Sequence, residues 1–195
     1  FLTSRASSEV SSATVDAAER LVLRGGAWSK RSLSVRYGLY LSQTAGPVLI
    51  DTGYTRHAVS DPGRSLGLRA YSRALSPRLL EAGQPATILA RFGLAPKDVA
   101  QVVVTHFHAD HVSGLKLFPN ARFLASHAAW ASLTGRSRLA NLRHGIFDEL
   151  LPPDFADRLD LMETSKRVCP LPHLDATGHD TLGDGKLAVR ERQSL

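Results

Sequence analysis

The chain has 195 residues, enough for one compact domain with a sizeable core, and its 43% hydrophobic and 22% charged residues are ordinary for a soluble globular protein. No apolar run reaches about 18 residues, so we expect no membrane-spanning helix and no membrane partner. The formal net charge of +6 is spread over singly scattered basic residues, which argues against a nucleic-acid partner.

Residues 1–19 are rich in Ser, Thr and Ala and hold no long apolar segment. We therefore expect a mobile or processed arm, and no secretory signal within it. Cys169 is the single cysteine of the chain, which excludes an internal disulfide, and we expect a cytoplasmic location.

The next segments favour β-strands. Residues 21–23 (Leu-Val-Leu) indicate a short strand that ends at a Gly-Gly pair. Residues 33–42 alternate apolar and polar side chains, which is the period-two pattern of a half-buried strand. A further short strand over residues 48–50 completes the opening meander of a sheet.

Residues 51–53 (Asp-Thr-Gly) end that strand. The polar residues 55–76 give no clear assignment, and we interpret Tyr54 and His57, which follow residues 51–53 closely, as parts of a surface loop. Residues 87–92 predict a helix that stops at Gly93.

A cluster of potential metal ligands follows a fully apolar strand over residues 102–104, which suits a central, covered position. Three histidines and one aspartate then occur within six positions. Imidazole nitrogen and carboxylate oxygen are the ligands that zinc prefers. His106 and His108 lie two apart and point the same way on an extended segment. Asp110 and His111 follow where the chain must turn, so one loop can supply ligands for two adjacent metal ions.

Beyond this loop, residues 112–115 indicate a helix packed behind the site, with Gly114 allowing the backbone to come close to the metal loop. Residues 121–125 indicate another strand, and Ser126 is a predicted N-cap of the helix after it. The basic residues 136–143 are compatible with one more helix.

The motif His-Phe-His-Ala-Asp-His after an apolar strand resembles the signature of the metallo-β-lactamase fold superfamily of metallo-hydrolases. Residues 49–53, Leu-Ile-Asp-Thr-Gly, resemble a strand-end segment of the same superfamily. The resemblance is good over residues 20–125. It implies an α/β fold, an αββα sandwich of the metallo-β-lactamase type.

The resemblance also implies a site for two zinc ions. His106 and His108 are implied as ligands of the first ion, and Asp110 and His111 as ligands of the second. Asp110 is further implied as the catalytic group that steers the proton of the attacking water. Asp51 is implied beneath the site, where its carboxylate helps to orient a histidine ligand.

The end of the chain leaves two placements for a third histidine ligand. Residues 176–180 resemble the turn that carries it, with His179 as the ligand. Alternatively, residues 179–185 resemble a segment that precedes this turn, with residues 187–189 as the strand between them. The second placement is favoured, and it predicts a partial domain over residues 20–195 whose C-terminal part is missing and which binds zinc with reduced stoichiometry.

Residues 144–175 mix apolar and acidic side chains. They resemble the variable segment that covers the substrate cleft in many members, and a peripheral helix pair is the alternative. The implied function is a zinc-dependent hydrolase that uses a metal-bridging hydroxide on a small ester, lactone or thioester. A catalytically incomplete binding or scaffold module is the alternative, and the sequence leaves the oligomeric state open.

Overall fold

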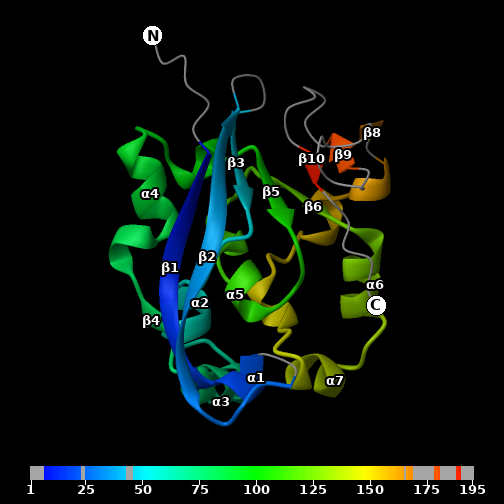
Figure 1. The fold of residues 1–195 in the computed structure, drawn as a ribbon. Coiled ribbons are helices and arrows are strands. Elements are labelled where there is room, and N and C mark those ends of the chain that lie inside the picture. Colours follow the sequence, from blue (N-terminus) through cyan, green and yellow to red (C-terminus); the bar gives the residue numbers. More distant parts are fainter. Residues whose placement is uncertain are drawn as a thin grey trace.

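A seven-stranded mixed sheet forms the centre of the structure (Figure 1). This computed structural model describes residues 7–22, 25–42, 46–164, 166–168, 178–180 and 188–189. The strands of the sheet are β1 (Ser7–Ala18), β2 (Lys30–Ser42), β3 (Gly46–Ile50), β4 (Arg78–Leu79), β5 (Gln101–Val104), β6 (Arg122–Ala125) and β7 (Leu159–Leu161). They lie in the order β4-β1-β2-β3-β5-β6-β7, antiparallel from β4 to β3 and parallel from β3 to β7.

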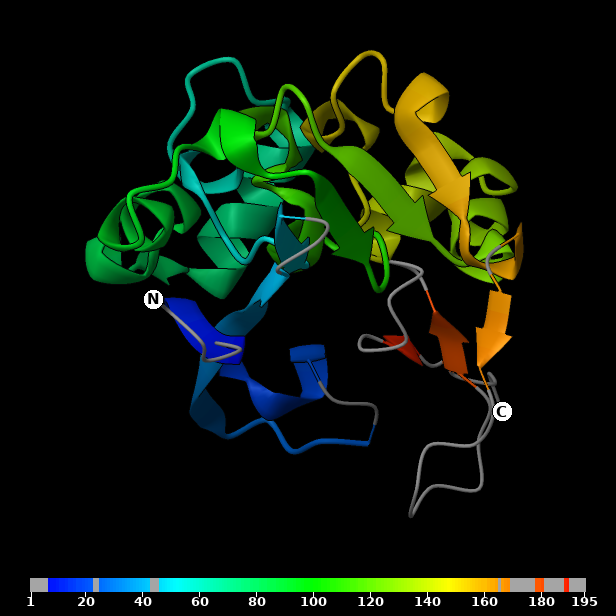
Figure 2. The same ribbon diagram turned by 90° about the horizontal axis from the view of Figure 1, so that it is seen from above.

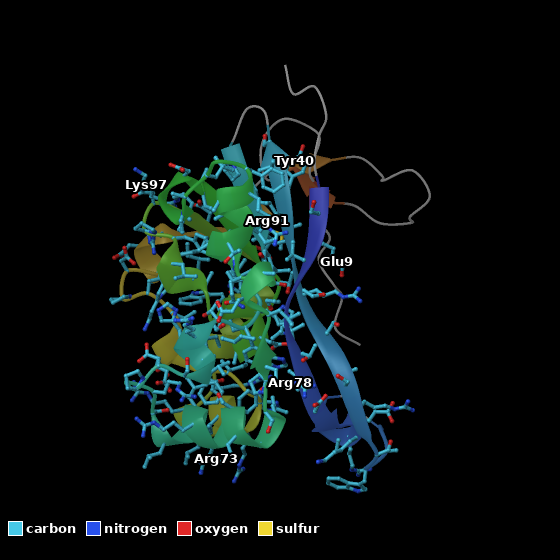
Figure 3. The ribbon with its side chains drawn as sticks, turned by 90° about the vertical axis from the view of Figure 1, so that its left-hand side faces the viewer. Glu9, Tyr40, Arg73, Arg78, Arg91 and Lys97 are labelled. Atoms are coloured by element: carbon cyan, nitrogen blue, oxygen red, sulfur yellow. The ribbon has the colours of Figure 1, made fainter. Side chains whose placement is uncertain are left out.

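Helices cover one face of this sheet, as Figure 2 shows from above and Figure 3 from the side. The helices of this layer are α2 (Arg56–Val59), α3 (Leu66–Leu75), α4 (Pro85–Arg91), α5 (Ala109–Val112), α6 (His127–Thr134) and α7 (Arg138–Arg143), whereas the short α1 (Glu19–Val22) follows β1 at the end of the β1–β2 hairpin. A small antiparallel sheet lies on the other side and contains β8 (Lys166–Val168), β9 (Gly178–Asp180) and β10 (Ala188–Val189). Within the described residues, no helix is long and apolar enough to cross a membrane.

Side-chain alternation along the parallel strands divides the core between the two faces of the sheet. Val102 and Val104 are fully buried in the large cluster that includes the helices. Val103, between them, is fully buried in a smaller cluster with Val48 and Leu124. The prediction of a central, covered strand over residues 102–104 is therefore confirmed.

The predicted mobile arm over residues 1–19 is wrong from Ser7 onward, because these residues form β1. This strand pairs with β2 along its whole length. Its small apolar side chains Ala13, Val15 and Ala17 are buried at every second position. Small residues between serines and threonines give a weak strand signal, and pairing with β2 decides the conformation. The short strand predicted from residue 21 is also wrong, since α1 includes residues 21 and 22.

Residues 55–76, for which the sequence gives no clear assignment, contain α2 and α3, and His57, expected in a surface loop, lies in α2. Helix α3 begins after Ser65, whose Oγ accepts a hydrogen bond from the Leu68 N–H (3.2 Å). Leu68 and Leu75 are buried on one face of the helix, one heptad apart. Tyr54, expected at the surface, is only 1% exposed. Arg69 and Arg73 are exposed on the opposite face of α3, so the amphipathic pattern of this helix is present in the sequence.

Other predicted elements are confirmed. The strands expected over residues 33–42, 48–50 and 121–125 are β2, β3 and β6. Helix α4 ends before Gly93, which has a φ of +70°. Ser126 caps α6 by accepting a backbone N–H of its first turn (3.1 Å).

The covering segment or helix pair expected over residues 144–175 is part of the body of the fold as far as residue 164. Its apolar side chains Ile146, Phe147 and Phe155 are buried in the large core cluster. The same segment supplies β7, which extends the parallel part of the sheet. Alternating apolar residues therefore mark core packing here, and residues 165 and 169–175 lie outside the described parts.

Candidate metal centre

Two loops meet at one edge of the sheet because β3 and β5 are parallel neighbours. Ile50 pairs with Val103, and the Asp51 N–H donates to the Val103 carbonyl oxygen (2.8 Å). The carboxyl ends of both strands therefore lie side by side. The histidine loop, from Thr105 to His111, starts there and leads into α5, near the centre of Figure 1.

The Asp51 side chain connects these two loops. It is 5% exposed, and its carboxylate accepts hydrogen bonds from the Thr105 N–H (2.9 Å) and the Thr105 hydroxyl (2.7 Å). Its Oδ2 also accepts from His111 Nδ1–H at 2.7 Å. Asp51 has a φ of +60°, in the left-handed region that Asp and Asn tolerate better than most residues. Asp51 thus fixes both the start of the histidine loop and the orientation of the His111 ring.

Hydrogen bonds from the loop after β3 hold the C-terminal end of the histidine loop. Thr52 donates from its N–H and its hydroxyl to the His111 carbonyl oxygen (2.9 and 2.8 Å) and accepts the Gly114 N–H (2.9 Å). A Cβ at Gly114 would lie 2.8 Å from the Thr52 Cβ, so the close approach at this glycine is to the loop after β3 and not, as predicted, to the histidine loop. Fully buried Ser113 makes two further hydrogen bonds to the loop after β3, at 2.9 and 2.8 Å.

The four side chains predicted as metal ligands line one cavity. The His106 ring centroid lies 4.6 Å from that of His108 and 3.8 Å from that of His111. His111 Nε2 lies 3.4 Å from Asp110 Oδ2. Two ligands that are each about 2.1 Å from a tetrahedral zinc ion are about 3.4 Å apart. Asp110 and His111 therefore have the spacing of two ligands of one ion.

The residue types fit zinc, but the four side chains do not form a closed cage. Within the described residues, no group of three or more His, Cys, Asp or Glu side chains is arranged to hold one metal ion. The donor set is nevertheless the one that zinc prefers, with three imidazoles and one carboxylate. Asp51 also stands behind His111 as the carboxylate partner that metal-binding histidines use. The donor types of all four side chains, and the spacing of Asp110 and His111, therefore fit zinc.

Electrostatics distinguishes these imidazoles. Burial lowers the pKa of His106 to about 4, and the neighbouring charge of His111 adds to this effect. Burial also acts to lower the pKa of His111, but hydrogen bonds to Asp110 and Asp51 outweigh it and raise the pKa to about 10. Burial opposes ionisation of Asp110, yet contact with His111 lowers its pKa overall. At neutral pH, His106 is therefore neutral and Asp110 is ionised, the protonation states that metal ligands need, whereas His111 is protonated and would have to lose its proton on binding a metal ion.

The cavity above the histidine loop has a volume of about 650 Å³. Its apolar lining comes from the β1–β2 hairpin and α3: Val15, Leu33, Val35 and Leu75. Its aromatic lining consists of Tyr54 and Tyr71. A polar part of the wall comes from the end of α7: Arg143, His144 and Gly145. The volume and the mixed lining suit a small organic substrate.

The end of α7 is tied to the histidine loop through the backbone. His108 and Ile146 form an isolated antiparallel bridge, and the Ala109 N–H donates to the Gly145 carbonyl oxygen (3.0 Å). Gly145 has a φ of +71°, and a Cβ there would lie 2.6 Å from the Tyr71 hydroxyl oxygen. The segment before Gly145 is therefore fixed at the cavity wall by contacts that only glycine permits.

Sequence reasoning did not identify the residues of the cavity wall. Tyr71 lies on α3 three and four residues from buried leucines, and this helical period could have found it. No sequence signal marks Arg143 or His144, because their position depends on the bridge between the loop after α7 and the histidine loop. Burial raises the pKa of Tyr71 to about 12, so its hydroxyl stays protonated in the cavity.

His179 lies in a strand, not in the turn that one placement predicted for it. Residues 178–180 form β9, which pairs with β8 and β10. The second placement predicted a strand over residues 187–189, and β10 covers residues 188 and 189. The side chain of His179 and residues 181–187 lie outside the described parts of the chain.

Comparison with known families gives one match that spans most of the chain. Residues 37–181 match the family model described as "Metallo-beta-lactamase superfamily". The matched segment runs from β2 through β9 and includes Asp51 and the whole histidine loop.

Two curated relatives illustrate the sequence similarity. The chain is 31% identical over 116 residues to an N-acyl homoserine lactonase of Bacillus cereus, a match that covers 56% of this chain and 46% of the relative. It is 36% identical over 98 residues to a probable metallo-hydrolase of Mycobacterium tuberculosis, covering 50% of this chain and 30% of the relative. The chain thus spans half or less of the length of these curated relatives.

Solved structures share the fold at low sequence identity. A probable metal-dependent hydrolase from Staphylococcus aureus aligns with a TM-score of 0.65 and 16% identity, covering 90% of this chain and 63% of that one. An N-acyl homoserine lactone hydrolase with the product N-hexanoyl-L-homoserine bound at its catalytic metal center aligns with a TM-score of 0.62 and 19% identity, covering 89% and 64%.

Proposed function

The chain belongs to the metallo-β-lactamase superfamily, and on this basis we propose that it is a zinc-dependent hydrolase of a small ester, lactone or thioester. The observation that carries the proposal is the meeting of four potential ligands, His106, His108, Asp110 and His111, at the floor of one cavity. Asp51 supports them from below through His111 and the start of the loop.

In this proposal, His106 and His108 hold one zinc ion, and Asp110 and His111 hold a second. Bound zinc would lower the pKa of a water molecule to about 7 and polarise the substrate carbonyl. The protein side chains then control position and proton transfer. Asp51 keeps the His111 ring in place, and the Asp110 oxygen that does not face His111 accepts the proton of the attacking water.

A lactone is the preferred substrate class in this proposal. The Bacillus cereus relative is named as an N-acyl homoserine lactonase, and a structure with the same fold carries an acyl-homoserine product. The apolar side chains Val15, Leu33 and Val35 of the cavity would pack against an acyl group. A thioester presents the same carbonyl to the same groups and is the first alternative substrate.

A substrate panel tests the proposed function. The full-length protein is assayed with lactone, thioester, β-lactam and phosphodiester substrates, with and without added zinc. We expect zinc-dependent turnover of the lactone or the thioester. His108→Ala and Asp110→Asn should abolish it while circular dichroism remains native, and Asp98→Asn, an exposed carboxylate in the turn before β5, serves as the control. Turnover retained in His108→Ala or Asp110→Asn would contradict the assignment.

A further inference from the structure

One side of the cavity carries positive charge that the proposed hydrolysis does not use. Arg143 and His144 line the cavity directly beside the histidine loop. Basic side chains are therefore grouped next to His108.

Among the described residues, Arg143 is the arginine of the cavity lining that is available to bind a ligand. Within the described residues, its side chain has no hydrogen bond or ion pair. Arg36, the other arginine of the cavity lining, is neutralised by Glu9 at 3.1 Å, and Figure 3 labels this glutamate on β1. Arg138, at the start of the same helix as Arg143, pairs with Asp148 at 3.3 Å.

No carboxylate of the cavity lining balances Arg143. Among the described residues that line the cavity, Asp110 is the only acid, and it contacts His111. A cation in the last turn of a helix also interacts favourably with the helix dipole. The interaction with the helix dipole does not require the Arg143 side chain to line a cavity. It therefore does not explain why this side chain lies at the cavity wall.

We propose that this side of the cavity binds an anionic group of the substrate, a carboxylate or a phosphate, with Arg143 as its direct ligand. The inference rests on the proposed hydrolase function and specifies its substrate as an ester, lactone or thioester with an apolar part and an anion. The apolar part lies against Val15 and Leu33, and the anion lies at the end of α7. A guanidinium group suits this role because its N–H groups bind a carboxylate or phosphate in pairs.

Matched substrates test the proposal in the zinc-loaded full-length protein. One γ-lactone carries a ring carboxylate, and its isostere carries a neutral ring carboxamide. We expect Arg143→Gln to lower kcat/KM for the carboxylate lactone roughly tenfold more than for the carboxamide, mainly through KM, because a charge-assisted hydrogen bond is lost. Arg143→Lys should retain part of the preference, and Arg138→Gln, on the same helix, should leave it unchanged. Equal effects of Arg143→Gln on both lactones would overturn the proposal.

Anion binding without turnover separates this inference from the hydrolase proposal. Inorganic phosphate is titrated into the metal-free full-length protein by calorimetry, with native circular dichroism checked for each variant. We expect saturable binding that Arg143→Gln weakens roughly tenfold and Arg138→Gln does not change. If no lactone is hydrolysed but this pattern holds, the hydrolase function fails and the anion site stands. The absence of binding, or equal loss in both variants, refutes the anion site.

Discussion

The substitution Asp51→Asn removes one negative charge below the histidine loop and keeps the size of the side chain. Asn also tolerates the φ of +60° at this position, so the backbone is not newly strained. Its amide oxygen can still accept the Thr105 N–H, but its NH₂ group then faces the His111 Nδ1–H, where Asp51 Oδ2 accepts at 2.7 Å. A hydrogen bond to a charged group contributes about 1.5–3 kcal/mol, and that contribution is lost.

Two measurements follow from this loss. The free energy of unfolding of the metal-free protein, from urea titration, should fall by about 1.5–3 kcal/mol. Zinc affinity, from competition with a chromophoric chelator, should fall about 10- to 100-fold, because the His111 ring is no longer held for metal binding. The control Asp98→Asn changes a carboxylate away from the loop and should leave zinc affinity unaltered. An Asp51→Asn protein that binds zinc within twofold of the original affinity would refute the role assigned to Asp51.

Two further predictions concern the supports of the site. Gly145→Ala should reduce the free energy of unfolding by about 1–3 kcal/mol more than Gly93→Ala, because both glycines have positive φ but only the first Cβ meets the Tyr71 hydroxyl. Equal losses in urea titrations would contradict this, and adding Tyr71→Phe should recover part of the difference. Ser113→Ala leaves two buried backbone groups without their partner and should cost about 2–5 kcal/mol. The control Ser60→Ala changes an exposed serine and should alter the free energy of unfolding by less than about 0.5 kcal/mol. Similar melting temperatures for the Ser113→Ala and Ser60→Ala variants would contradict the role assigned to the buried hydrogen bonds of Ser113.

The sequence predicts the centre of this molecule well because its signals there are local. The apolar residues 102–104 reveal a covered strand, and the spacing of the histidine loop places its side chains together. The close backbone approach at Gly114 could be predicted, but its partner Thr52 could not, because Thr52 lies far away in the sequence. Each of these predictions depends on residues that are near in sequence and on one physical rule.

The predictions that failed depend on partners far away in the sequence. Strand β1 contains small and polar residues whose conformation is decided by pairing with β2. Helix α3 is an exception, because its buried leucines and exposed arginines follow a helical period that the sequence contains. Arg143 reaches the cavity only because His108 and Ile146 form a bridge, which no pattern in the sequence marks. Contacts between residues far apart in the sequence, and not local secondary-structure propensity, determine which residues line the cavity wall.

Zinc analysis of the full-length protein, combined with X-ray absorption at the zinc edge, tests the central claim most directly. The account predicts two zinc ions per full-length protein, with imidazole and oxygen ligands. The double variant His106→Ala/His108→Ala should lose one ion, and Asp110→Asn should weaken binding of the other. Zinc content and ligand scattering that do not change in these variants would contradict a metal centre at the histidine loop.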